Sequence, residues 1–70
     1  MDIKLLMIDA LRKKYEAEIA DAYASALVYF NSSVGIGEHP QFIDELDKFI
    51  NKISSAEENI QTLNKYFTDK

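Results

Sequence analysis

The residues best suited to chemistry lie in one short stretch, VGIGEHPQF, from Val34 to Phe42. It contains both glycines, the single proline and the single histidine of this 70-residue chain. Glu38 and His39 are side chains that could bind a metal ion or transfer a proton. Two adjacent residues do not readily converge on one ion, and the chain has no cysteine and no second histidine to complete a site. We therefore expect no catalytic residue, no metal site and no cofactor, and a protein that is not an enzyme.

The same stretch has a structural interpretation as the turn between two helices. Gly35 suits the left-handed position just past a helix end, and Gly37 gives a second permissive backbone position. His39 precedes Pro40, so its backbone is held in extended conformations, which suits an N-cap, and Pro40 fits the first position of the next helix. We expect these four residues to form the turn and cap, with partner docking as the alternative role.

A second candidate for chemistry is the basic run Arg12, Lys13 and Lys14, which Lys65 could join from the end of the chain. Such residues could contact phosphates, so the alternative function is a nucleic-acid-binding accessory protein. The chain as a whole has 12 acidic and 8 basic residues, for a net charge of −4. This balance disfavours nucleic acid as the main partner, because affinity for nucleic acid depends heavily on neutralised phosphates.

The second half of the chain follows a heptad pattern and predicts one amphipathic helix over about 40–67. Its apolar residues alternate at spacings of four and three: Phe42, Leu46, Phe49, Ile53, Ala56, Ile60, Leu63 and Phe67. The stretch from Ser54 to Glu58 also matches a capping box, which could restart a helix. The unbroken heptad favours a continuous helix, but the sequence leaves a break at Ser54 and Ser55 open.

The first half predicts a helix over about 2–34. Its seam keeps the same register through Met1, Leu5, Ile8, Tyr15, Ile19, Ala22, Ala26 and Tyr29, with Arg12 in one seam position. We expect the stem of Arg12 to pack in the seam and its guanidinium to reach Glu57 or Glu58. The alternative role for this buried polar residue is to fix the register by penalising wrong alignments.

Two helices joined by a turn at about 35–39 predict a helical hairpin, a single all-α domain over residues 1–70. The two long helices are then antiparallel. If the chain reverses near Gly37, Tyr29 lies near Phe42 and Ala22 lies near Phe49, so that large residues mostly face small ones.

A second apolar stripe runs beside the seam in the half of the chain nearest the turn. With two residues that widen the seam of the second helix, it comprises Ala20, Tyr23, Leu27, Phe30, Val34, Ile43 and Ile50. If exposed, these residues form a larger patch than soluble monomers usually tolerate. We expect the hairpin to self-associate through them as a dimeric four-helix bundle, with a different protein as the alternative partner. The sequence decides neither dimer against tetramer nor the relative orientation of the hairpins.

The sequence predicts neither a signal peptide nor a membrane span. The N-terminal stretch MDIKLLMIDALRKK is interrupted by Asp2, Lys4 and Asp9 and lacks a small-residue cleavage site. No apolar run approaches the roughly 20 residues that a membrane helix needs. We expect a cytoplasmic protein that is not secreted and does not bind a membrane.

The stretch VGIGEHPQFIDELDKFINKISSAEENIQTL resembles a group of small helical-hairpin proteins with a GIGEHP-type turn, encoded by tailed phages of marine bacteria. The matching residues are Gly35 to Pro40 and Ala56 to Glu58, within a match over roughly the second half of the chain. The resemblance implies a phage origin and a helical hairpin. It allows a role in the virion, in assembly or in modulating a host protein, and it carries over no catalytic residue.

Overall fold

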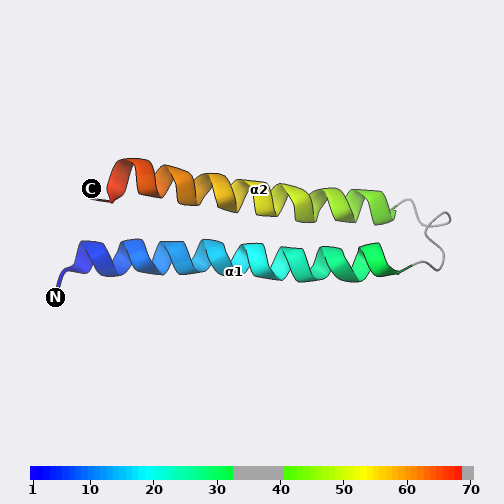
Figure 1. Cartoon of the computed structure of the whole chain (residues 1–70), viewed down its shortest axis with the longest axis horizontal. Helices are drawn as coiled ribbons and strands as arrows, with labels where there is room; N and C mark the ends of the chain where they lie inside the picture. The colour runs from blue at the N-terminus through cyan, green and yellow to red at the C-terminus, as the bar shows by residue number, and fades with distance from the viewer. Residues whose placement is uncertain (33–40, 69–70) are drawn as a thin grey trace.

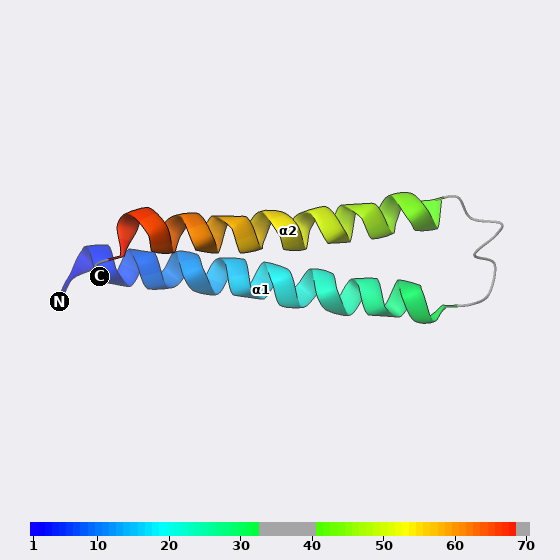
Figure 2. The ribbon, with the colours of Figure 1, turned by 45° about the horizontal axis from the view of Figure 1, so that its top comes forward.

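A computed structural model describes residues 1–32 and 41–68, and it is a hairpin of two long helices (Figure 1). Helix α1 spans Ile3–Asn31 and helix α2 spans Gln41–Phe67. Two views show the helices side by side and antiparallel, with the start of α1 and the end of α2 at the same end of the hairpin (Figures 1 and 2). The predicted all-α helical hairpin is confirmed.

Helix α1 begins with a side-chain cap. Asp2 is extended, and its carboxylate accepts hydrogen bonds from the backbone N–H groups of Lys4 at 2.9 Å and Leu5 at 3.4 Å. These bonds satisfy two of the N–H groups that a helix leaves free at its start. At the other end Ser32 is extended, so α1 ends at Asn31, whereas the sequence pattern continues to about 34. Gly35, Gly37, His39 and Pro40, predicted to form the turn and cap, lie outside the described residues.

Helix α2 runs without a break through Ser54 and Ser55, which answers the question left open by the capping-box pattern. Ala56 directly follows these serines and is only 1% exposed. The seam is therefore packed against α1 at this point, and a continuous helix keeps the seam in register.

The core is a single narrow seam between the two helices. Its buried residues are Ile8, Ala22 and Ala26 of α1 and Ala56 and Leu63 of α2, and all of them belong to the predicted heptad seams. Most of these are alanines, which let the helices approach closely but bury little apolar area. At the open end of the hairpin, the predicted seam residues Met1, Leu5 and Phe67 remain more than half exposed.

The hairpin is extended rather than compact. Its Cα radius of gyration is 16.1 Å, whereas a compact chain of this length has a radius of about 11 Å. Its accessible surface is 5434 Å², roughly 1,000 Å² above the area of about 4,450 Å² that is typical of a compact protein of this mass. The single hairpin therefore leaves an unusual share of its surface uncovered.

Candidate interaction surface

The predicted stripe forms one exposed surface near the end of α1 and the start of α2. We call the described residues Ala20, Tyr23, Leu27, Phe30, Ile43 and Ile50 the loop-proximal patch. Each α1 member directly follows a seam residue, as Tyr23 follows Ala22, and Ile50 likewise follows Phe49 on α2. One position turns about 100° around a helix. Because the helices are antiparallel, this step leads to the same side of the hairpin on both.

The large side chains of the loop-proximal patch are open to solvent. Tyr23 is 57% exposed, Leu27 40% and Phe30 61% on α1, while Ile43 is 67% and Ile50 49% exposed on α2. Val34, which the sequence adds to this set, lies outside the described residues. Contiguous exposed apolar side chains of this size are typical of protein–protein contact sites.

An aromatic cluster lies in the seam beside this patch. The ring of Tyr29 on α1 lies 5.2 Å from that of Phe42 and 5.3 Å from that of Phe49, between centroids. The interplanar angles are 58° and 71°, within the tilted to edge-on range that aromatic pairs prefer. The predicted contact between Tyr29 and Phe42 is confirmed. These rings give the loop-proximal patch a rigid support.

Arg12 lies half-buried in the seam, but its partner differs from the prediction. Its Nη2 donates a hydrogen bond of 2.6 Å to the amide oxygen of Asn64 on α2. The expected contact with Glu57 or Glu58 is wrong. Side chains of an α-helix lean toward its N-terminus. On an antiparallel neighbour this direction leads past the glutamates toward the end of α2, where Asn64 lies. A role of Arg12 in fixing the register stays a prediction.

The basic residues of the stem make contacts within the chain. Lys13 pairs with Asp9 at 3.0 Å, and Lys14 pairs with Glu18 at 2.5 Å. The hydrogen bond and the negative charge of Glu18 raise the pKa of Lys14 above its usual value. Carboxylates on the same helix therefore offset these positive charges, which do not form an open phosphate-binding patch.

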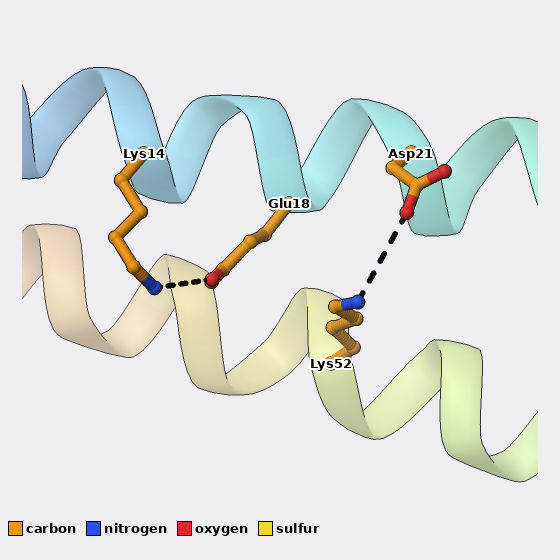
Figure 3. Close-up of polar contacts among 4 residues, drawn as sticks. All are labelled: Lys14, Glu18, Asp21 and Lys52. Atoms are coloured by element: carbon orange, nitrogen blue, oxygen red, sulfur yellow. Dashed lines mark hydrogen bonds and ion pairs between the residues drawn. The ribbon is translucent and has the colours of Figure 1, made fainter.

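One flank of the hairpin carries an alternating row of charges (Figure 3). The Nζ of Lys52 on α2 lies 4.0 Å from a carboxylate oxygen of Asp21 on α1. Their side chains are 49% and 73% exposed. An exposed pair at this distance contributes little to stability, so Asp21 remains available to another partner.

The described residues offer little for catalysis or metal binding. Within residues 1–32 and 41–68, no three His, Cys, Asp or Glu side chains group closely enough to hold a metal ion. A shallow, open depression on α2 is lined by Ser54, Glu57, Glu58 and Gln61. Glu38 and His39, considered above for metal binding or proton transfer, lie outside the described part of the chain. Neither described helix is both long and apolar enough to cross a membrane.

Sequence reasoning missed a second set of exposed apolar residues. On α1 these are Ile3, Leu6, Met7, Leu11 and Val28. Three of them, Ile3, Met7 and Val28, follow the seam by two positions. A search for a further alternation of three and four on α1 would have found this signal.

Comparison of the chain with protein-family models, with curated proteins and with solved structures found no match. Its function must therefore be inferred from the surfaces of the hairpin.

Proposed function

We propose that this chain is a non-enzymatic interaction or structural protein that self-associates through the loop-proximal patch, most simply as a dimeric four-helix bundle. The observation that carries the proposal is the exposure of five large apolar side chains on one side of the hairpin, between 40% for Leu27 and 67% for Ile43. Full burial of one such side chain stabilises by roughly 1.5–3 kcal/mol. In a two-fold symmetric dimer each residue is buried twice.

The surface area of the hairpin supports a partner of similar size. The excess over a compact chain is roughly 1,000 Å², and a standard interface buries about 800 Å² on each partner. One face-to-face contact between two hairpins would remove most of this excess. Oligomerisation is also a usual source of stability for chains of this length that lack disulfides and metals.

The described surfaces favour self-association over nucleic-acid binding. The nucleic-acid alternative would use Arg12, Lys13, Lys14 and Lys65. Arg12 is hydrogen-bonded to Asn64, and Lys13 and Lys14 are paired with carboxylates. Nucleic-acid binding would require these contacts to be exchanged for phosphates on a chain of net charge −4.

The resemblance of Gly35 to Pro40 to phage hairpin proteins supports one context for this assembly. We propose that it serves in a virion, in virion assembly or in binding a host protein. Pull-down from infected cells, followed by mass spectrometry, tests this context. Recovery with virion proteins would support the first two roles, and recovery with one host protein would support the third.

Sedimentation equilibrium of the purified chain tests self-association directly. We expect a mass of at least two chains at ~100 μM, falling on dilution as mass action requires. A stable monomer at that concentration would overturn self-association and leave the patch for a different protein. Metal analysis of the same sample tests the non-enzymatic assignment at Glu38 and His39, which a stoichiometric metal ion would contradict.

A further inference from the structure

One flank of α1 carries a heptad row of its own. Met7, Lys14, Asp21 and Val28 recur there every seven residues, each two positions after a seam residue. Two positions turn about 200°, which leads out of the seam to the flank of α1 where Asp21 reaches Lys52 of α2. We call this surface the outer row. Met7 is 64% and Val28 68% exposed, so the apolar ends of the row have no cover within the hairpin.

A second line of residues alternates with these four, and three of its four members are alanines. Ile3 begins this second line, and Ala10, Ala17 and Ala24 continue it at the same seven-residue spacing. The alanines allow another helix to approach closely, but they do not determine which helix binds. The larger and charged residues between the alanines determine which helix binds and in which orientation.

The outer row is complementary to the same row of a second copy that runs in the opposite direction. From the start of α1, Met7, Lys14, Asp21 and Val28 are apolar, positive, negative and apolar. Antiparallel pairing with a second copy therefore puts Met7 on Val28 and Lys14 on Asp21, twice by symmetry. Parallel pairing would put Lys14 on Lys14 and Asp21 on Asp21. Facing like charges are destabilising, whereas opposite charges in a helix interface select the orientation.

Both charged residues are accessible in the single hairpin. Figure 3 shows Lys14 and Asp21 on the same flank of α1, on either side of Glu18. The side chain of Lys14 is 61% exposed and that of Asp21 is 73% exposed. The contact of Asp21 with Lys52 spans 4.0 Å, so this carboxylate has no short bond to lose. The incoming Lys14 has three N–H donors, so it can bind Asp21 while it shares its ammonium group with its own Glu18.

We propose that α1 pairs with α1 of another copy through the outer row, in antiparallel orientation, with the two-fold axis near Ala17. This surface is distinct from the loop-proximal patch, because it lies a further step of about 100° around α1. Helix α1 then has neighbours on three sides, as expected for a helix that is apolar around most of its circumference. With both surfaces occupied, each hairpin contacts two others, and the smallest closed assembly that uses both contacts is a tetramer with two-fold symmetry.

Introduced cysteines test the orientation, because the natural chain contains none. Under mild oxidation, Ala17→Cys should form a disulfide-linked dimer, since position 17 meets itself near the two-fold axis. Met7→Cys and Val28→Cys should each fail to link to themselves. An equimolar mixture of these two variants should link, since the two positions face each other within disulfide range. Ser55→Cys, on the exposed side of α2, measures background linking.

The opposite pattern would overturn the proposal. Parallel pairing links Met7→Cys to itself and Val28→Cys to itself, and the mixture gains no mixed dimer. Linking no greater than that of Ser55→Cys at all positions means that the outer row is unoccupied, and this result overturns the proposal as well.

Exchanging the charges tests what selects the partner. Lys14→Asp should halve the assembled mass in native mass spectrometry, because it puts two carboxylates face to face. Adding Asp21→Lys to the same chain should restore the mass. The contact with Glu18 is lost in both variants, so it cannot explain the rescue. No change in the single variant, or no rescue in the double variant, overturns the proposal. Leu27→Glu changes the loop-proximal patch and leaves the outer row intact, so it tests the proposed function separately.

Discussion

Tyr29 of α1 lies edge-on to Phe49 of α2, with ring centroids 5.3 Å apart and an interplanar angle of 71°. The same tyrosine ring lies 5.2 Å from that of Phe42, one heptad earlier on α2. One α1 side chain therefore contacts two α2 seam residues that lie two helical turns apart. This cluster fixes the register of the hairpin where the loop-proximal patch is exposed, so the patch depends on it for its shape.

Tyr29→Ala should therefore lower the free energy of unfolding substantially. Aromatic-to-alanine changes in full cores cost about 3–5 kcal/mol, and we expect about 2 kcal/mol for this half-buried ring. The measurement is thermal unfolding by circular dichroism at matched chain concentration. Tyr66→Ala is the control, because that ring is 65% exposed. Equal losses for the two variants would mean that the cluster does not hold the hairpin together.

Leu27→Glu should disrupt assembly through the loop-proximal patch. It introduces a charge at the centre of the proposed contact, and the charge is buried twice in a symmetric assembly. We expect the sedimentation mass to fall by at least half and the melting temperature to fall with it. Ser25→Glu, on the other flank of α1, should change neither. If Leu27→Glu keeps the mass and melting curve of the parent, the patch serves another purpose.

The hydrogen bond between Arg12 and Asn64 can be measured with a double-mutant cycle. Asn64→Ala should cost about 0.5–1.5 kcal/mol, as the loss of a typical side-chain hydrogen bond does. Arg12→Met keeps most of the apolar stem and removes the donor. In that background Asn64→Ala should cost almost nothing, because the partner is already gone. The same cost in both backgrounds would show that Asn64 contributes independently of Arg12.

Periodicity was sufficient to predict the hairpin. Alternation at three and four residues identifies both seams, and antiparallel pairing of the seams places Tyr29 beside Phe42, as the structure has it. These features depend only on where each Cα–Cβ bond points, which the helical repeat determines. The partner of Arg12 depends on how a long side chain leans along the helix, and a seam pattern does not contain that information.

The outer row shows a different limit of sequence reasoning. Its two charged residues, and the alanines that alternate with its members, give it a weak apolar signal, although its spacing is as regular as that of the seam. Met7 and Val28 become apparent only when the structure shows that both are more than half exposed. The loop-proximal patch was easier to predict because its residues are large. Whether either surface is occupied depends on other molecules, which the sequence of one chain does not describe.

Ala56→Leu should destabilise the hairpin although leucine is the more hydrophobic residue. Ala56 is 1% exposed in the narrow seam, and extra methylene groups in a packed core typically cost 1–3 kcal/mol. Chemical denaturation at fixed concentration measures this change. Ser55→Leu adds a similar side chain at the neighbouring exposed position and should be nearly neutral. Stabilisation by Ala56→Leu would show that the helices are not closely packed at that level.

The pair formed by Lys14 and Glu18 should give the hairpin a small pH dependence in the alkaline range. The hydrogen bond to Glu18, followed by its charge, raises the pKa of Lys14 above the ordinary value of 10.5. A group with a raised pKa in the folded state stabilises that state fully below its unfolded pKa. The contribution is then lost as the pH rises above 10.5 and through the raised pKa. NMR titration of the Lys14 side chain should show this raised pKa, and Glu18→Gln should bring it back toward 10.5. If the pKa of Lys14 is the same in the parent and in Glu18→Gln, the two side chains do not pair in solution.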